Sequence, residues 1–447
     1  MSDGDQGGGD QGGGEVQGVD EIAAPSLIDD CFLHDKDRLR HDEALNLLKQ
    51  RLSKIVSSET IPAADALGRI LAQDITAPHE VPLHTNAAVD GYAFNSDEFD
   101  GSSMPVSARI TAGDLNPKEL QPGAAARIFT GAPMPPGAQT VAMQEDCHEQ
   151  EGQVQLPVGL KPGANCRLSG EDLQPGDLVV EKGKFLAAAD LAALASIGIH
   201  QVPAFNKLKV ALFSNGNEMR VPEKAKRSLL PGEVYDANQP LLAALCAHLP
   251  VELSPMGIIR DTAKAAEEAI ASASTTHDVI ITTGGASRGA EDHMVTVLDK
   301  LGKRHLWQLA VKPGRPMIFG QLPRGGSGQD CLYFGLPGNP VAAMVCFLLY
   351  ARPALLTLAG ANWQVPPRYK IPAAFSIAKK KPDRREFMRG KLVTDEEGNL
   401  QVAKYERDGS GLISSLRQSD GLIEIPEEVT SLQQGELVSF LPFSGFQ

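Results

Sequence analysis

The most informative stretch of the chain begins Asp278-Val279-Ile280-Ile281-Thr282-Thr283-Gly284-Gly285. After Asp278, residues 279–283 form a β-branched, mostly apolar run with the length of one buried strand. A glycine-rich loop follows, and then Met294, Val297, Leu298 and Leu301 repeat at the spacing of one helix face. A strand that enters a helix through a glycine loop is the repeating unit of an α/β sheet, so the sequence predicts a domain of that class.

The same rhythm extends over residues 208–360. A continuous apolar strand covers residues 210–213, a helix begins near Gln239, and a second strand ends at Ile259. Asp261 is placed to cap the helix that comes next. We therefore predict a mostly parallel sheet that is covered by helices on both faces.

The chain on either side has a different character. Between residues 60 and 180, short β-type runs are separated by glycine and proline clusters, and an alanine-rich helix is predicted at residues 187–197. Short strands return after Trp363, which predicts a small β domain or barrel at the C-terminus.

Composition excludes several classes of protein. A chain of 447 residues exceeds what one core usually supports, so several domains are expected. The formal charge of −14 argues against a nucleic-acid binder, and no run of twenty apolar residues indicates a membrane span. The six cysteines form no CxxC pair, so neither a zinc site nor a disulfide framework is indicated. These features predict a cytoplasmic protein.

Residues 1–30 are acidic and rich in glycine. They contain eight acidic residues, no lysine or arginine, and a repeated Asp-Gln-Gly-Gly-Gly. Such a segment buries too little apolar surface to offset the entropy of ordering, so we predict a disordered tail. A tail that binds a partner is the alternative.

Four strand ends of the α/β domain carry glycines and acids together. They are Ser214-Asn215-Gly216-Asn217-Glu218, Arg260-Asp261, the loop from Gly284 to Asp292, and Gly335-Leu336-Pro337-Gly338-Asn339-Pro340. Ligands of open α/β sheets bind at this edge. Glycines let a phosphate approach backbone N–H groups, and carboxylates beside a phosphate suit Mg²⁺. We predict a site for an anionic ligand with a divalent ion; ordinary turns are the alternative for any single loop.

Two groups of cations accompany these loops. Lys312-Pro313-Gly314-Arg315-Pro316 places two cations near the predicted site. A second basic cluster contains Lys379, Lys380, Lys381, Arg384, Arg385 and Arg389. A solvated charged face is the alternative interpretation of this second cluster. The sequence contains neither GxGxxG nor GxxxxGK[ST], so dinucleotide and P-loop binding are not supported.

Seven motifs in order resemble one family. They are Asn86-Ala87-Ala88-Val89-Asp90-Gly91-Tyr92-Ala93, Arg127-Ile128-Phe129-Thr130-Gly131-Ala132, Gly170-Glu171-Asp172, Tyr235-Asp236-Ala237-Asn238, Gly284-Gly285-Ala286-Ser287, Lys312-Pro313-Gly314-Arg315-Pro316 and Gly335-Leu336-Pro337-Gly338-Asn339-Pro340. The chain resembles the molybdopterin molybdenumtransferases of the MoeA type, which are related to the gephyrin E domain. The resemblance covers residues 35–446.

The resemblance implies an α/β multidomain protein. Its central part would be a doubly wound α/β domain of the molybdopterin-binding type at residues 208–360. A discontinuous linker domain would comprise residues 31–80 and 175–207, with a β-rich domain at residues 81–174 and a small β-barrel at residues 361–447. The family forms an elongated homodimer, with the active cleft between protomers. Molybdopterin adenylyltransferase and molybdoenzyme acceptors are further expected partners.

The implied substrates are adenylylated molybdopterin and molybdate, with Mg²⁺ assisting and AMP released. The expected catalytic residues are Asp90, Asp172, Glu218, Asp261, Asp292 and Lys312. Glu218, Asp261 and Asp292 would hold the metal. The expected substrate-binding residues are Thr130, Gly284, Gly285, Ser287, Arg315, Pro337, Gly338, Pro340, Arg389 and Ser410.

The chain departs from the family pattern at two positions of the predicted site. Asn217 stands where an aspartate is common, and Gln308 stands where a cation is expected. Residues 305–311 are predicted to form a strand, which would place Gln308 and Lys312 on one face. These departures leave one alternative open, and the shared α/β domain leaves open another. One is a weakened paralogue that acts as a scaffold or cofactor carrier, and the other is a nucleotide-linked pyrophosphatase or adenylyltransferase.

Overall fold

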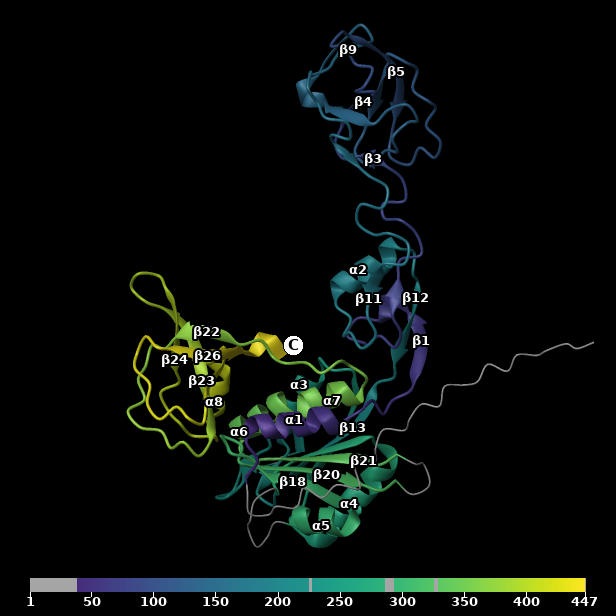
Figure 1. The fold of residues 1–447 in the computed structure, drawn as a ribbon. Coiled ribbons are helices and arrows are strands. Elements are labelled where there is room, and N and C mark those ends of the chain that lie inside the picture. The colour runs from purple at the N-terminus through teal and green to yellow at the C-terminus, as the bar shows by residue number, and fades with distance from the viewer. Residues whose placement is uncertain (1–37, 225–226, 286–292, 325–328, 447) are drawn as a thin grey trace, which may run out of the picture.

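The computed structural model describes residues 38–224, 227–285, 293–324 and 329–446, and the backbone alone at residues 306 and 307. The predicted tail at residues 1–30 lies outside this range. Figure 1 shows an elongated molecule. The α/β domain and the C-terminal β domain lie at one end, a slender linker domain follows, and the β-rich domain lies at the far end.

The α/β domain contains a six-stranded sheet in the order β16-β13-β17-β21-β20-β18. Its strands are β13 (Leu208–Asn215), β16 (Val251–Ile259), β17 (Val279–Thr283), β18 (Lys303–Gln308), β20 (Pro316–Leu322) and β21 (Cys331–Leu336). The first four strands of this order are parallel, and β20 and β18 are antiparallel. The prediction of a mostly parallel sheet is therefore confirmed.

Helices cover both faces of this sheet, as predicted (Figure 1). They are α3 (Asn238–Cys246), α4 (Ala263–Thr276), α5 (His293–Leu301), α6 (Pro340–Cys346) and α7 (Arg352–Leu358). Leu242 of α3 belongs to the larger hydrophobic core, whereas Ile270 of α4 belongs to a second core on the other face. β13 is the first of these strands in the sequence, and β16 and β17 lie on either side of it. The helices before and after β16 cover opposite faces, so the sheet has its topological switch between β13 and β17.

Two details of this domain differ from expectation. Thr262, and not Asp261, caps α4, because its side-chain oxygen accepts a hydrogen bond from the backbone N–H of Ala265. The segment Pro340–Leu358 is apolar enough to cross a membrane by composition, with α6 and α7 joined by a π-helical turn at Phe347–Ala351. Since 94% of its most apolar window is buried within the protein, it has the position of a core helix.

The first helix, α1 (His41–Arg51), packs on the α/β domain. Its buried face of Ala44 and Leu48 lies in the larger core, and Arg385 of the C-terminal domain forms an ion pair with Asp42 at 2.7 Å. The range predicted for the linker domain, residues 31–80, includes this segment, whereas the apolar face of α1 packs on the core of the α/β domain. Amphipathic periodicity predicted the helix but carries no information on which domain covers its apolar face.

His41 is completely buried and anchors the start of α1. Its Nδ1 lies 2.7 Å from the hydroxyl of Tyr350, and its ring packs edge-on against Phe387. Burial and, to a smaller extent, the Arg385 charge lower the pKa of His41 to about 3. The imidazole is therefore neutral in the folded protein at neutral pH.

This depressed pKa makes the docking of α1 sensitive to acid. Below about pH 6.5, His41 binds a proton in the unfolded chain but not in the folded chain. The free energy of unfolding therefore decreases as the pH falls toward the pKa of the folded state. Urea unfolding should show that wild type loses about 2 kcal/mol more than His41→Phe between about pH 6.5 and 5. The exposed His200→Gln should behave as wild type. Equal losses in wild type and His41→Phe would contradict this account.

The linker domain is formed by two separate segments of the chain. Its elements are β1 (Ser58–Pro62), β2 (Ile75–Thr76), β11 (Leu178–Val180), α2 (Ala188–Ser196) and β12 (Gln201–Phe205). β1 pairs with β12 and β2 pairs with β11, both antiparallel. A core around Leu71 and Leu194 joins the two segments.

The β-rich domain is inserted between these segments. Its six-stranded sheet contains β4 (Gly91–Phe94), β5 (Met104–Ile110), β6 (Ala125–Ile128), β7 (Thr140–Met143), β8 (His148–Gln150) and β9 (Gln153–Gln155). Two short strands, β3 (Asn86–Ala87) and β10 (Cys166–Arg167), pair at its base. The boundary lies at the bridge between Val81 and Leu173.

The C-terminal domain contains a second sheet, and a short strand that leaves the α/β domain adds to it. Its elements are β22 (Tyr369–Pro372), β23 (Arg385–Thr394), β24 (Leu400–Lys404), α8 (Ile413–Arg417), β25 (Gly421–Ile425) and β26 (Leu437–Pro442). The two-residue strand β19 (Val311–Lys312) leaves the α/β domain and pairs in parallel with β23. This pairing brings Lys312 beside Glu386 and so joins the two domains.

Candidate active site

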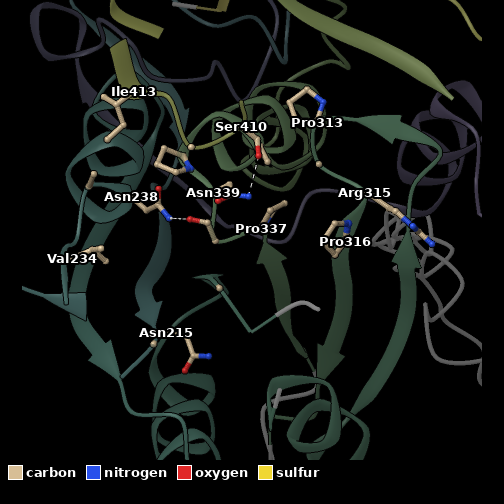
Figure 2. A pocket seen from close by; sticks show the side chains of 18 of the residues that line it. Asn215, Val234, Asn238, Pro313, Arg315, Pro316, Pro337, Asn339, Ser410 and Ile413 are labelled. Atoms are coloured by element: carbon tan, nitrogen blue, oxygen red, sulfur yellow. Dashed lines mark hydrogen bonds between the residues drawn. The ribbon is translucent and has the colours of Figure 1, made fainter. Parts of the chain in front are cut away.

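A cavity of about 1090 Å³ lies at the carboxyl ends of the parallel strands, at the topological switch. All four predicted strand-end loops contribute to it, through residues that include Asn215, Asp261, Gly284 and Pro337. The C-terminal domain closes one side with Ser410 and Ile413 (Figure 2). The convergence predicted from the order of strands and loops is thus observed.

Two glycines let the loops pack closely against one another. Gly284 and Gly285 have φ angles of +83° and +71°, and a Cβ at Gly284 would lie 2.5 Å from the carbonyl oxygen of Asn215. A Cβ at Gly338 would lie 3.5 Å from the Cα of Gly284. The β13, β17 and β21 loops therefore meet backbone to backbone, which is the arrangement that admits a phosphate group.

Two of the three predicted metal ligands face the cavity. Asp261 Oδ2 accepts a hydrogen bond from the backbone N–H of Asn217 at 3.0 Å, and Asn217 Oδ1 accepts one from the backbone N–H of Asp261 at 3.2 Å. The Glu218 carboxylate lies against Gly216, where an added Cβ would come within 2.5 Å of it. Asp292 and Ser287 lie outside the described residues.

These carboxylates fit a magnesium ion that a substrate phosphate helps to hold. Mg²⁺ is commonly bound by one or two carboxylates together with phosphate oxygens. Asp261 Oδ1 and both oxygens of Glu218 make no hydrogen bond within the described ranges, so they are available as ligands. No group of three or more potential metal ligands occurs in that part of the chain. Asn217 ties the two loops together without adding a third carboxylate.

The cations of the predicted Lys-Pro-Gly-Arg-Pro loop line the opposite side of the cavity. Lys312 Nζ lies 3.2 Å from Glu386 Oε2, with the lysine side chain 47% exposed and the glutamate side chain 11% exposed. Arg315 donates to Gln308 Oε1 at 3.4 Å. A Cβ on Gly314 would lie 2.5 Å from Cys346 Sγ, so this glycine lets the loop rest on α6.

The expectation that Gln308 and Lys312 share one strand face is wrong. β18 ends at Gln308, and the chain then crosses to the sheet of the C-terminal domain, where Lys312 pairs with Glu386. Gln308 contacts Arg315 instead. The absence of a cation at position 308 therefore affects the surroundings of Arg315 and not those of Lys312.

Glu386 partly neutralises the charge that Lys312 offers to an anion. Glu386→Gln keeps the size of the side chain and removes its charge, so it should tighten oxyanion binding about fivefold. Molybdate titration by calorimetry measures this effect. Arg368→Gln, which alters the neighbouring ion pair with Glu424 away from the cavity, is the control. Unchanged or weaker binding by Glu386→Gln would mean that the pair is needed to hold Lys312 in place.

Ser410 reaches the cavity from the C-terminal domain (Figure 2). Its hydroxyl accepts a hydrogen bond from Asn339 Nδ2 at 3.0 Å, and its carbonyl oxygen accepts one from the backbone N–H of Val341 in the first turn of α6. The Ser410 loop is therefore attached to the loop that carries Pro337, Gly338 and Pro340.

Arg389 lines the cavity, but its guanidinium is bound by the protein itself. Its side chain is buried and donates to Ser415 Oγ and to the carbonyl oxygens of Arg407 and Gly409, at 2.8 to 3.2 Å. Burial lowers the pKa of Arg389. Its observed contacts make it a positioning residue for the Ser410 loop.

The rest of the second basic cluster is also largely structural. Lys380 is buried and donates to the carbonyl oxygens of Pro426 and Glu427. Arg385 forms ion pairs with Asp42, Glu424 and Glu427. Lys380 and Arg385 therefore bind groups of the protein itself, whereas Lys379 and Lys381 are exposed.

The remaining predicted residues lie in the distant β-rich domain and at its base (Figure 1). Asp90 Oδ1 accepts hydrogen bonds from the backbone N–H and the hydroxyl of Thr130, both at 2.8 Å. These two bonds hold the pKa of Asp90 below its usual range. Asp172 is exposed, and its backbone N–H donates to Val81. Within one chain, neither acid lines the cavity.

Sequence reasoning missed three residues that organise the site. Asn238 donates to the carbonyl oxygen of Gly338, Asn339 contacts Ser410, and Glu386 pairs with Lys312. Asn238 and Asn339 lie in motifs that were recognised, and their side-chain amides were the signal available. Glu386 had no such signal, because its neighbour is 74 residues away in sequence.

The fold and the cavity together define a class of protein. It is a multidomain α/β protein whose strand-end cavity combines close-packed glycine loops, carboxylates and cations, which suits a phosphate-bearing ligand.

Comparison with known proteins places the chain within that class. Residues 39–198 match the MoeA N-terminal region (domain I and II), residues 214–357 match a probable molybdopterin binding domain, and residues 370–443 match the MoeA C-terminal region (domain IV). A molybdopterin molybdenumtransferase from Haemophilus influenzae is 33% identical over 406 residues, which cover 90% of this chain and 98% of that protein. Another from a Nostoc species is 34% identical over 328 residues, covering 71% and 74% of the two chains.

A solved structure agrees with these matches. The molybdopterin biosynthesis MoeA protein from Pyrococcus horikoshii has a TM-score of 0.77 and 27% identity, covering 91% of this chain and all of that one. The chain belongs to the MoeA family. The predicted family, fold class and involvement in molybdenum cofactor biosynthesis are confirmed.

Proposed function

We propose that this protein transfers molybdenum from molybdate into adenylylated molybdopterin and releases AMP. The observation that carries the proposal is the shared cavity of Lys312, Arg315, Glu218 and Asp261 at the glycine-lined strand ends. Relatives named molybdopterin molybdenumtransferase support the same activity. The scaffold and pyrophosphatase alternatives gain no support from these relatives.

The cavity supplies separate places for the charges of the two substrates. Lys312 and Arg315 would bind oxyanions, the first as a point charge and the second through its planar fork. Gly284, Gly285 and Gly338 let a phosphate approach the backbone, while Asn339 and Ser410 offer hydrogen-bonding groups. Pro337 and Pro340 would shape the loop, and Arg389 would hold Ser410 in position.

Glu218 and Asp261 would hold Mg²⁺, with Asp292 as the expected third ligand. When bound, the ion would neutralise negative charge on the pyrophosphate as AMP leaves. The carboxylates have oxygens available for this role, and the neighbouring cations keep the site from being uniformly acidic.

We further propose that a homodimer completes the active site. Asp90, Thr130 and Asp172 lie far from the cavity of their own chain (Figure 1). In a two-fold dimer the β-rich domain of one protomer would reach the cavity of the other, so that each dimer has two equivalent sites. Leu168 lies four residues before Asp172, and Leu83 follows the bridge between Val81 and Leu173; each leucine is 54% exposed and would be covered in such a dimer.

In this arrangement Asp90 acts as an anion that orients a substrate proton. Its pKa is held low by Thr130, so the carboxylate is charged at neutral pH and is a weak base. Accepting a hydrogen bond from the attacking oxygen or its bound water suits such a group better than storing a proton.

The proposed activity is tested by combining purified protein, adenylylated molybdopterin and molybdate. Release of AMP and transfer of the product to an apo-molybdoenzyme should both require molybdate, and both should decrease when Mg²⁺ is removed. AMP release without molybdenum insertion would instead identify a pyrophosphatase. Interaction with molybdopterin adenylyltransferase and a cytoplasmic location remain predictions.

A further inference from the structure

Two arginines lie side by side on the sheet of the β-rich domain. Arg109 of β5 and Arg127 of β6 are register partners on neighbouring parallel strands, so both side chains project from one face of the sheet. Arg109 is exposed and Arg127 is half-buried. Like charges opposite each other on neighbouring strands are unfavourable, and an anion bound between them would remove that cost.

The ring of Phe129 holds both guanidinium groups in place. The guanidinium carbon of Arg109 lies 4.7 Å from the centroid of this ring, and that of Arg127 lies 4.8 Å from it. Arg127 also lies over the ring of Tyr92, at 5.0 Å from its centroid, and donates to the carbonyl oxygen of Gly91 at 2.9 Å. Contacts with aromatic faces orient a guanidinium and leave its charge in place.

The positive charge of this pair is not balanced by an ion pair. In the part of the chain that the structure describes, no carboxylate forms an ion pair with either arginine, and the side chain of Arg109 makes no hydrogen bond. Glu149, which contacts Tyr92 of the same sheet, accepts a hydrogen bond from the tyrosine hydroxyl at 2.5 Å. Arg109 therefore has its donors available for an anion.

The pair also lies close to Asp90. Thr130, which binds the Asp90 carboxylate, directly follows Phe129 in the chain. The hydrogen bonds from Thr130 and, to a smaller extent, the charge of Arg127 lower the pKa of Asp90. The two arginines and Asp90 therefore belong to one part of the domain, where they would meet the same ligand.

We propose that Arg109 and Arg127 bind a phosphate of the substrate that occupies the cavity of the partner chain. The inference rests on the proposed function, because the proposed homodimer brings Asp90, and the arginines beside it, to that cavity. The planar fork of a guanidinium matches two phosphate oxygens, whereas Lys312 would contact the substrate as a point charge. The β-rich domain would thus contribute to substrate affinity as well as supplying Asp90.

Binding of inorganic pyrophosphate to the full-length protein, measured by calorimetry at one Mg²⁺ concentration, tests this site. Arg109→Gln should weaken binding about tenfold. Arg109→Lys should weaken it less, because the charge is kept and only the planar fork is lost. Lys118→Gln removes an exposed cation of the same domain and is the control, which should bind as wild type does. Equal affinity of Arg109→Gln and this control would overturn the proposal.

Mixed dimers show whether the arginines act on the cavity of the partner chain. One chain carries Arg109→Gln and the other carries Lys312→Met, which alone should weaken pyrophosphate binding in the cavity. If the site is shared across the dimer, one of the two sites combines Lys312 of the first chain with Arg109 of the second. Half of the sites should then bind pyrophosphate with wild-type affinity. Weakened binding at every site, or unchanged binding by Lys312→Met alone, would overturn the shared site.

The failure of this inference can be distinguished from failure of the proposed function. Molybdenum insertion by the wild type, together with unchanged pyrophosphate binding by Arg109→Gln, rejects the arginine site alone. Weakened pyrophosphate binding by Arg109→Gln, in a protein whose wild type inserts no molybdenum, supports the arginine site and rejects the transferase activity alone.

Discussion

Lys312→Met is expected to lower kcat/KM for molybdenum insertion by about 100-fold to 1,000-fold. Lys312 is 47% exposed and lines the cavity, so methionine removes a charge that faces the substrate and keeps most of the aliphatic stem. The ammonium group would contact an oxyanion directly, and such a charge-assisted contact is about twice as strong as a neutral one. The assay is AMP release coupled to reconstitution of an apo-molybdoenzyme.

The stability of Lys312→Met should be close to that of wild type. The ion pair with Glu386 is half exposed on the lysine side, and such pairs contribute little to the free energy of unfolding. Lys379→Met removes an exposed lysine of the C-terminal domain that does not line the cavity, so it is the matched control. Activity of Lys312→Met within about threefold of this control would remove Lys312 from the catalytic machinery.

Asp90→Asn is expected to reduce turnover by roughly 100-fold although Asp90 lies in a different domain from the cavity. Asparagine retains a side-chain oxygen that can accept both hydrogen bonds from Thr130, so the local geometry is preserved and the charge alone is lost. The melting temperature should therefore be unchanged. Asp100→Asn is the control, since Asp100 is also an exposed turn acid of the β-rich domain with hydrogen bonds to a neighbouring residue.

The sequence was sufficient to predict the α/β sheet and the edge at which ligands bind. Apolar runs ending in glycine loops specify buried parallel strands, and parallel strands place their carboxyl ends on one edge. For this reason Asp261, Gly284 and Pro337, which are far apart in sequence, were expected together and are found lining one cavity.

Contacts between domains could not be predicted in the same way. The apolar face of α1 was visible in the sequence, but its partner is the core around Leu309 and Phe347, about 260 to 300 residues away. The expected pairing of Gln308 with Lys312 failed because the chain leaves one sheet and enters another between these residues. Alternation along a strand holds only while the strand continues.

The chemical role of a charged residue also could not be predicted from the sequence. Arg389 matches a family motif, yet its buried guanidinium holds the carbonyl oxygens of Arg407 and Gly409. The N–H donors of a buried arginine need hydrogen-bond acceptors. Whether a substrate or the protein supplies these acceptors depends on tertiary packing, which a local sequence pattern does not predict.

The central claim is that each active site combines the cavity of one chain with Asp90 of another, and subunit complementation tests it most directly. Asp90→Asn and Asp261→Asn should each be nearly inactive alone. Co-expressed in equal amounts with different affinity tags, they should recover about a quarter of wild-type activity, because half of randomly formed dimers are mixed and each mixed dimer has one intact site. Purified mixed dimers should have about half of wild-type activity. If purified mixed dimers are as inactive as the two parents, Asp90 does not act on the cavity of the partner chain and the account is contradicted.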